Sequence, residues 1–278
     1  MLVNLNEVLK KAQNEKYAVG LFNTTDTDML QAVIEAAEES NSPVILGTAE
    51  VLLPYGELKL IAPSVIAAAK RAKVPVVVHY DHGLTFDRCI EALKLGFSSI
   101  MFDGSAKPYE QNIAETREMV KIAHAFGATV EGEIGHVGEA AKEDNLLTDM
   151  YTTPEEAKAY LDATGVDALA VAIGSAHGVY KKKPMLNIER LKEISGKVKV
   201  PLVLHGGSGL SDDDFKNTIR NGIAKVNIFT DLCLAGERAM KDGEEKKLGY
   251  LETRNLKVDY IKEAVKHKMA LFGSVNKA

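Results

Sequence analysis

Hydrophobic residues along this chain fall into eight short runs, which are separated by longer stretches of helical periodicity. The runs are rich in Val, Ile and Ala, and most of them are apolar at every position. Strands that are covered by helices on a parallel sheet have this pattern, because both of their faces are buried. The predicted strands are residues 17–23, 43–48, 74–81, 98–103, 128–134, 168–174, 200–205 and 224–229.

The stretches between these runs carry the start and stop signals of amphipathic helices. The first begins at Asp26, a suitable N-cap, and keeps apolar residues at helical spacing. Similar patterns cover residues 85–96, 109–127, 153–165 and 211–222, several of which close with a glycine C-cap. Eight such alternations, without a linker or a short repeat, predict an α/β protein with a single (β/α)8 TIM barrel over residues 1–278.

An open, doubly wound sheet is the structural alternative. That fold would require a glycine-rich dinucleotide loop after the first strand, and the segment LFNTTDTD at that place is not one. The pattern therefore favours the barrel.

Composition and charge exclude several classes of partner. The chain has 278 residues and a net charge of −5, so we expect no general affinity for nucleic acid or for a membrane surface. Its start lacks the layout of a signal peptide, and no apolar run reaches the ~18 residues of a membrane span. The two cysteines, Cys89 and Cys233, are predicted to be buried free thiols. These features predict a cytoplasmic protein.

Polar residues collect where the predicted strands end. Barrel enzymes place their active sites at this edge, and each buried polar group costs free energy unless it is paired. The polar residues at these ends are Asn23, Asp81, His82, Asp103, Glu133, His177, His205, Asn227 and Thr230. Such convergence from separate strands predicts a functional site.

Three of these residues, His82, His177 and His205, suggest a metal. Three imidazoles with one or two open coordination positions are typical of a catalytic zinc site. The three lie far apart in sequence, so the hypothesis depends on the barrel. Asp81 has two interpretations, an orienting partner of an imidazole or a general acid/base that faces the site. Its position alone does not decide between them.

Glycine-rich segments near the end of the chain suggest an anion site. Gly206, Gly207 and Ser208 directly precede a predicted helix, and the next strand ends at Asn227. The loops after strands 7 and 8 commonly bind phosphate in barrels, through backbone N–H groups and a helix N-terminus. The segment GSAHGVYKKK adds a further glycine and a run of three lysines. We therefore expect a small phosphorylated ligand.

Six ordered segments resemble the class II, metal-dependent ketose-bisphosphate aldolases of the fructose- and tagatose-bisphosphate type, and the likeness covers nearly the whole chain. The segments are YDHG at 80–83, MFDGS at 101–105, EGEIG at 131–135, AVAIGSAHGVY at 170–180, PLVLHGGSG at 201–209 and KVNIFTDL at 225–232.

The resemblance implies a role for each candidate residue. Zinc would be bound by His82, His177 and His205, with secondary metal positions at Asp103 and Glu133. Asp81 would be the catalytic aspartate and Asn227 would orient the ketone end of the substrate. The substrate and its phosphate would be held by Asn23, Gly178, Lys181, Gly206, Gly207, Ser208, Asn227, Ile228, Phe229 and Thr230, with a monovalent cation, Na⁺ or K⁺, beside the phosphate.

The implied reaction is the reversible cleavage of a ketose phosphate into dihydroxyacetone phosphate and an aldehyde such as glyceraldehyde 3-phosphate. Fructose 1,6-bisphosphate and tagatose 1,6-bisphosphate are the expected types of substrate. Zinc would stabilise the enediolate, and Asp81 would move the proton of the C4 hydroxyl. The resemblance also implies a homodimer or homotetramer.

Three positions depart from the family pattern. The loop glutamate that moves a proton of dihydroxyacetone phosphate falls on Ala141, so Glu143 or Glu139 is expected to replace it. Phe229 occupies a position that is small or acidic in relatives. Arg254 is the candidate for the distal phosphate, although it is not cleanly in register.

Two other functions remain as alternatives. A metal-free aldolase would form a Schiff base, with Lys225 as the candidate nucleophile, but it would leave the three strand-end histidines without a role. A noncatalytic barrel would bind a sugar phosphate or stabilise a partner enzyme, and it would be free to lose Asp81 or a zinc ligand. All of those residues are present.

Overall fold

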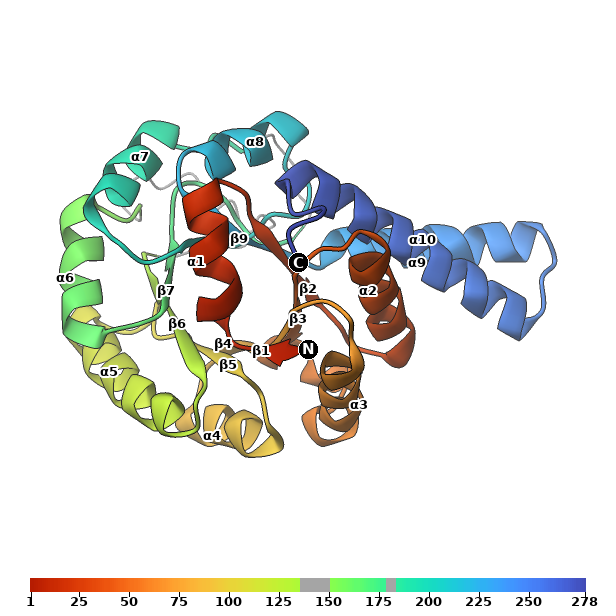
Figure 1. Cartoon of the computed structure of the whole chain (residues 1–278), viewed down its shortest axis with the longest axis horizontal. Coiled ribbons are helices and arrows are strands. Elements are labelled where there is room, and N and C mark those ends of the chain that lie inside the picture. The colour runs from red at the N-terminus through yellow and green to blue at the C-terminus, as the bar shows by residue number, and fades with distance from the viewer. Residues whose placement is uncertain (136–150, 179–183) are drawn as a thin grey trace.

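Eight parallel strands close into a barrel that is surrounded by helices (Figure 1). The computed structural model describes residues 1–135, 151–178 and 184–278. The barrel strands are β2 (Val19–Asn23), β3 (Val44–Ala49), β4 (Val76–Gly83), β5 (Ser99–Phe102), β6 (Thr129–Ile134), β7 (Ala168–Val171), β8 (Leu202–Leu204) and β9 (Ile223–Ile228). Each pairs with its neighbour in sequence order, and β2 pairs with β9 to close the circle. The predicted (β/α)8 barrel is confirmed.

Helices follow the strands and cover the outside of the barrel. They are α2 (Thr27–Glu39), α3 (Leu58–Arg71), α4 (Phe86–Leu95), α5 (Tyr109–Ala125), α6 (Pro154–Thr164), α7 (Ile188–Lys197), α8 (Asp212–Arg220), α9 (Thr230–Glu245) and α10 (Tyr250–Phe272), with a short 3-10 helix η1 (Glu50–Tyr55) after β3. The N-cap expected at Asp26 is present, since its carboxylate accepts the N–H groups of Asp28 and Met29.

Two elements near the N-terminus were not predicted. Strand β1 (Leu2–Val3) pairs with the start of β4, but two residues are too few to give a hydrophobic pattern. Helix α1 (Leu5–Glu15) places Leu5 and Leu9 among apolar side chains that point into the barrel. It thus closes the end opposite to the carboxyl ends of the strands, and Figure 1 shows it across the barrel opening.

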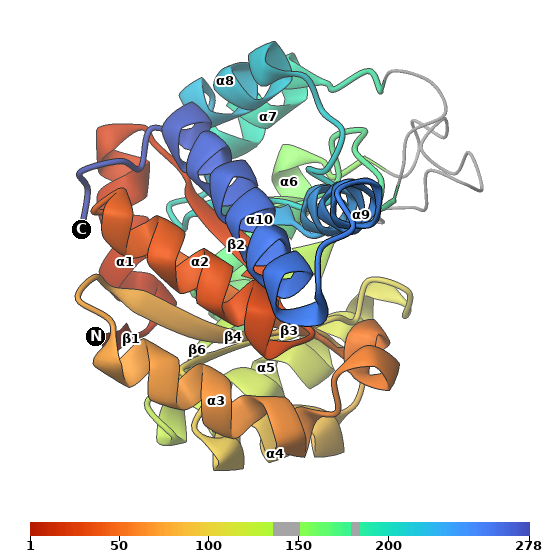
Figure 2. The same cartoon turned by 90° about the vertical axis from the view of Figure 1, so that its right-hand side faces the viewer.

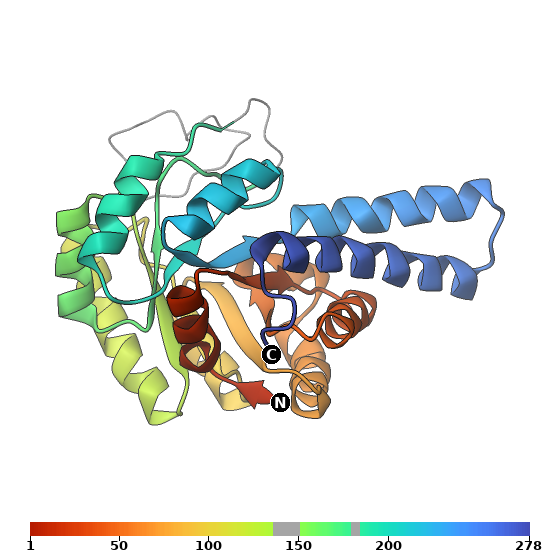
Figure 3. The ribbon, with the colours of Figure 1, turned by 45° about the horizontal axis from the view of Figure 1, so that its top comes forward.

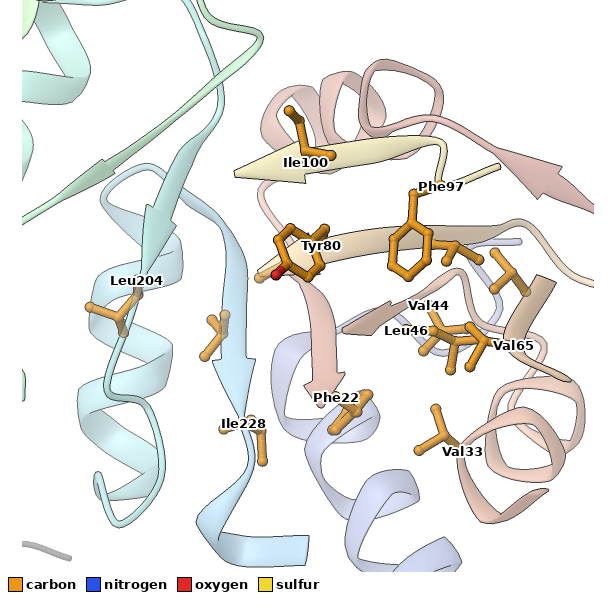
Figure 4. Packing of buried hydrophobic residues seen from close by; sticks show 14 of the residues in the cluster. Phe22, Val33, Val44, Leu46, Val65, Tyr80, Phe97, Ile100, Leu204 and Ile228 are labelled. Atoms are coloured by element: carbon orange, nitrogen blue, oxygen red, sulfur yellow. The ribbon is translucent and has the colours of Figure 1, made fainter. Parts of the chain in front are cut away.

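The main core lies between the strands and the surrounding helices. Phe22, Leu46 and Tyr80 point outward from their strands and pack with Val33 and Val65 of the covering helices (Figure 4). All five side chains are fully buried. Because the strands are buried on both faces, they carry the continuous apolar runs seen in the sequence.

Helices α9 and α10 form a hairpin that projects from the barrel (Figure 3). Helix α10 packs along α2 (Figure 2), while Tyr250 and Leu251 near the tip of the hairpin are exposed.

Cys89 is buried as predicted, but Cys233 on α9 is only partly buried, and both thiols are free. No helix in the described part of the chain combines the length and apolar character needed to cross a membrane.

Candidate active site

A pocket of about 650 Å³ opens at the carboxyl ends of the strands. Most of the polar residues predicted from the strand ends line it, together with the glycine segments. The predicted residues in its lining are Asn23, Asp81, His82, Asp103, Glu133, His177, Gly178, Gly206, Gly207, Ser208, Asn227, Ile228, Phe229 and Thr230. The tertiary structure therefore brings together residues that are spread over more than two hundred positions of the sequence.

Three histidines meet at the floor of this pocket. The ring centroid of His82 lies 4.5 Å from that of His205 and 5.0 Å from that of His177. One ring nitrogen from each of the three lies within 4.8 Å of the others, and His82, Asp103 and Glu133 form a second such group. Either group could hold a metal ion.

An irregular backbone lets two consecutive residues of β4 face the pocket. In a regular strand, Asp81 and His82 would point to opposite faces. His82 instead has a φ of 49°, and the pairing of β4 with β5 shifts register between Tyr80 and Gly83. Non-glycine residues rarely adopt this left-handed conformation, and such strain persists mainly at functional sites.

Two carboxylates determine the protonation of two of the histidines. Asp103 Oδ2 lies 2.7 Å from His82 Nδ1, and Glu131 Oε1 lies 2.8 Å from His205 Nε2. Because an ionised carboxylate only accepts hydrogen bonds, each imidazole donates from that nitrogen. The opposite nitrogens, His82 Nε2 and His205 Nδ1, face each other at 2.9 Å, where two lone pairs would repel each other.

A proton on His82 Nε2, or a metal ion bound by both nitrogens, would resolve this contact. Burial alone would lower the pKa of His82, but the Asp81 and Asp103 carboxylates outweigh it and raise that pKa to about 10. The pocket floor thus attracts positive charge strongly. His177 is neutral, because burial and the neighbouring His82 lower its pKa to about 3.

His177 completes a donor set that fits zinc. Its Nε2 atom is buried and has no hydrogen-bond partner among the described residues. An unpaired buried acceptor costs free energy, and three neutral imidazoles are a common ligand set for catalytic zinc. The residues present therefore fit a zinc ion held by His82, His177 and His205.

Asp81 is held by two amides at the edge of this group. Asn23 Nδ2 donates to Asp81 Oδ2 at 2.8 Å, and Asn227 Nδ2 donates to Oδ1 at 3.0 Å. Burial works to raise the pKa of Asp81, but the positive charges of His82 and Lys225 lower it well below the usual range. Among the described residues no imidazole lies within hydrogen-bond distance of Asp81, and the His79 ring is 4.0 Å away, so the geometry favours the second interpretation, a general base.

A buried ion pair beneath the histidines was missed by the sequence analysis. Lys225 Nζ lies 2.7 Å from Glu131 Oε2, both side chains are fully buried, and Lys225 also donates to Asn227 Oδ1 at 2.8 Å. The alternation of EGE at 131–133 was the available signal, since it places Glu131 and Glu133 on the same face of a strand.

The same contacts do not favour the Schiff-base alternative. Lys225 does not line the pocket, and its ammonium group is paired with Glu131. An ammonium group has no lone pair with which to attack a ketone.

The loops after β8 and β9 form the candidate anion site. Helix α8 directly follows the first loop, but Ser211 caps it and Asp212, Asp213 and Asp214 fill its first turn. Helix α9 has no side-chain cap and only Asp231 as an acidic residue in its first turn, so its N-terminus beside Ser208 and Thr230 is the more open of the two to an anion. The expected helix N-terminus is therefore that of α9.

Gly206 is required by the shape of this loop. Its φ is 66°, and a Cβ atom at this position would lie 2.3 Å from the carbonyl oxygen of Ala176. Only glycine allows the loop after β8 to approach the loop after β7 this closely. Gly178 on the second loop has a φ of 94° and faces open space.

One predicted residue, Arg254, does not line the pocket of its own chain. Arg254 lies on α10, where its guanidinium binds Asp28 at 2.8 Å and Gln31 at 2.5 Å, so within one chain it does not serve the distal phosphate. In this position Asp28 and Gln31 of α2 occupy the guanidinium. Glu143 and Lys181 lie outside the described residues.

Comparisons with known proteins agree with this geometry. Residues 3–277 match the family described as fructose-bisphosphate aldolase class-II. The chain is 40% identical to the fructose-bisphosphate aldolase of Thermus caldophilus and 41% identical to the uncharacterized protein YdjI of Escherichia coli (strain K12), in each case over the whole of both chains.

Solved structures extend the likeness to three dimensions. The crystal structure of the YdjI aldolase from Escherichia coli K12 matches all of both chains with a TM-score of 0.92 at 38% identity. That of a fructose-1,6-bisphosphate aldolase, described as putative, from Coccidioides immitis matches 99% of this chain and 97% of its own, with a TM-score of 0.89 at 29% identity. Aldolases of this kind are carbon–carbon lyases of sugar metabolism. This chain belongs to the class II fructose-bisphosphate aldolase family.

Proposed function

We propose that this enzyme is a zinc-dependent aldolase, which reversibly cleaves a phosphorylated ketose into dihydroxyacetone phosphate and an aldehyde. The observation that carries the proposal is that the ring nitrogens His82 Nε2 and His205 Nδ1 face each other at 2.9 Å, beside a His177 Nε2 that has no hydrogen-bond partner among the described residues. Bound zinc supplies Lewis-acid polarisation of the substrate ketone.

Asp81 is the general base for cleavage. Its carboxylate is ionised at neutral pH and is held in place by Asn23 and Asn227. Asp81 takes the proton of the C4 hydroxyl, the C4–O bond becomes the aldehyde carbonyl, and the C3–C4 bond breaks. The bonding electrons remain on C3, which leaves the enediolate of dihydroxyacetone phosphate.

Two further groups complete the cycle. Asn227 lies between Asp81 and His205 and orients the ketone end of the substrate. A carboxylic acid must then return a proton to C3, and Glu143, which lies outside the described residues, is assigned this role. In the direction of condensation each proton moves in reverse.

The phosphate of dihydroxyacetone phosphate binds to the loops after β8 and β9. Gly206, Gly207 and Ser208 would surround it from one side, and the uncapped N-terminus of α9 at Thr230 from the other. The described lining of the loops supplies no positive side chain to balance the phosphate. We therefore assign this role to Lys181 and a monovalent cation.

The proposal is tested by hydrogen exchange at C3 of dihydroxyacetone phosphate. NMR in deuterated water follows the loss of the C–H signal with the enzyme as purified, after chelation and after zinc is restored. Stereoselective exchange that stops with chelator and returns with zinc supports the function. Absence of exchange in folded, zinc-loaded enzyme contradicts it.

Replacing Glu131 by Gln should weaken zinc binding by about 10–100-fold, the usual effect of losing a carboxylate that orients a metal-binding histidine. The new amide is not an anionic acceptor for the N–H of His205, and it leaves Lys225 buried without a counter-charge. Competition with a chelator measures zinc affinity, and thermal unfolding measures stability. The Glu131→Gln, Lys225→Met double variant should recover stability but not zinc affinity. Unchanged zinc affinity in the single variant would remove Glu131 from the site.

Replacing Gly206 by Ala should raise the KM for dihydroxyacetone phosphate in the exchange reaction by about tenfold or more, since a misplaced binding group costs ~1.4 kcal/mol for each factor of ten. The new methyl group must displace the Ala176 carbonyl, which moves the loop away from the phosphate. Gly165→Ala is the matched control, because it meets nothing within 4 Å at a similar φ of 71°. An equal KM in both variants would argue against a phosphate at Gly206.

We further propose that the protein is a cytoplasmic homodimer or homotetramer. The projecting α9–α10 hairpin supports an oligomer, since it exposes Met240, Tyr250 and Leu251 on an arm that extends away from its own barrel. Light scattering after gel filtration checks the oligomeric state, and a monomer at micromolar concentration would contradict it.

A further inference from the structure

One wall of the pocket is apolar, and it lies across the barrel from the phosphate loops. Ala49 and the η1 residues Val51 and Leu52 follow β3, and Leu84 follows β4. In the closed order of strands, β4 is separated from β8 by three strands in either direction. We refer to Ala49, Val51, Leu52 and Leu84 as the distal wall.

This position identifies the part of the substrate that meets the distal wall. With the phosphate of dihydroxyacetone phosphate at Gly206 and Ser208, the ketone lies over the histidines at the centre of the pocket. The remaining carbons, which become the aldehyde, then extend toward β3 and β4. The distal wall is therefore the surface that selects the aldehyde.

The distal wall offers nothing that binds a phosphate. Among the described residues, the lining of the pocket contains no lysine or arginine, and its charged side chains other than histidine are Asp81, Asp103 and Glu133. Arg254, the one candidate from sequence for a distal phosphate, is bound by Asp28. A dianion placed here would lose hydration without gaining a counter-charge, which costs several kcal/mol.

A pair of hydrogen bonds to Glu50 holds the distal wall in place and adds negative charge behind it. Glu50, at the start of η1, accepts a hydrogen bond from the Leu84 backbone N–H at 2.9 Å and another from the Tyr80 hydroxyl at 3.0 Å. These two bonds fasten η1 to the end of β4. The wall is thus preformed, and the Glu50 carboxylate disfavours an anion near it.

From this wall we infer that the aldehyde fragment carries no phosphate. The substrate is a ketose 1-phosphate with a neutral far end, whose terminal carbons pack on Val51, Leu52 and Leu84. This inference rests on the proposed function, because it assumes that dihydroxyacetone phosphate occupies the other half of the pocket. It differs from the bisphosphate expected from the sequence, and Leu84 becomes a residue that determines specificity.

The test compares aldehydes in the direction of condensation. Zinc-loaded enzyme receives dihydroxyacetone phosphate with D-glyceraldehyde 3-phosphate, with D-glyceraldehyde or with propanal, and product formation gives kcat/KM for each. We expect D-glyceraldehyde to be used at least as efficiently as its 3-phosphate, and propanal to be accepted. A higher kcat/KM for the phosphorylated aldehyde would overturn the inference.

Substitution of Leu84 tests the wall itself. Leu84 is 45% exposed, so an arginine side chain can be accommodated at this rim position. Leu84→Arg should shift the preference toward glyceraldehyde 3-phosphate by about tenfold or more, as expected for a charge-assisted hydrogen bond. Leu84→Gln is the uncharged control and should leave the preference unchanged. An unchanged preference in both variants would overturn the assignment of this wall to the aldehyde.

Hydrogen exchange in the same preparations separates the two ideas. Exchange of dihydroxyacetone phosphate together with a preference for the phosphorylated aldehyde contradicts only the inference about the distal wall. Loss of exchange in zinc-loaded enzyme contradicts the proposed function, and the inference falls with it.

Discussion

Replacement of Asp81 by Asn is expected to lower kcat for ketose cleavage by about 10²–10⁴-fold, the usual contribution of a general base. The reason is that the carboxylate accepts the C4 hydroxyl proton, and an amide cannot. The exchange of dihydroxyacetone phosphate removes a C3 proton and does not involve C4. That exchange should therefore continue in the variant while cleavage is lost.

The pairing of these two assays makes the Asp81 prediction specific. Zinc content is measured first, because Asp81 contributes negative charge next to His82. Asn23→Ala is the companion variant, since it removes one of the two donors to Asp81 and keeps the carboxylate. It should slow cleavage less than Asp81→Asn does. Equal loss of cleavage and exchange in Asp81→Asn, at full zinc content, would show that Asp81 is not the base for the C4 hydroxyl.

Replacement of His82 by Ala is expected to abolish zinc retention, cleavage and exchange together. His82 belongs to both possible ligand groups, and it alone links the histidines to Asp103 and Glu133. Removing one of three imidazole ligands leaves a site with too few donors to hold zinc. Zinc is measured by elemental analysis after gel filtration, and both activities are assayed on the same sample.

A histidine outside the pocket provides the control for His82. His124 lies on α5, where its partly exposed ring binds Asp167 at 2.9 Å. His124→Ala should keep both zinc and activity. Because alanine at a φ of 49° is also strained, circular dichroism must show that His82→Ala is folded. A folded His82→Ala enzyme with full zinc content would remove His82 from the ligand set.

The fold was predictable because its signals are local. Each strand of a parallel barrel is apolar on both faces, so β3 and β4 stand out as runs of Val, Ile and Leu without knowledge of any partner. Strand β1 was missed because its two residues are too few to form a pattern. Helix α1 was also not predicted, and only the structure shows that its apolar face closes the barrel.

Much of the candidate site was also predictable, for a related reason. All strands of a parallel barrel end at the same rim, so polar residues at strand ends, such as Asp81, His82 and Asn227, must converge. The lining of the pocket follows this rule closely. Glu131 and its ion pair with Lys225 were missed because both residues lie inside their strands, below the rim, where the sequence shows only isolated charges within apolar runs.

The sequence by itself therefore determined the barrel, the rim on which the site stands and most of its side chains, since these follow from hydrophobic period and strand order. Tertiary structure decided how those side chains interact. Glu131 sets the protonation of His205 from 74 residues away, and Arg254 is bound by Asp28 rather than by the pocket. The distal wall exists only because η1 packs against the end of β4. Such contacts depend on distances between residues that are remote in the chain, and hydrophobic period carries no information about those distances.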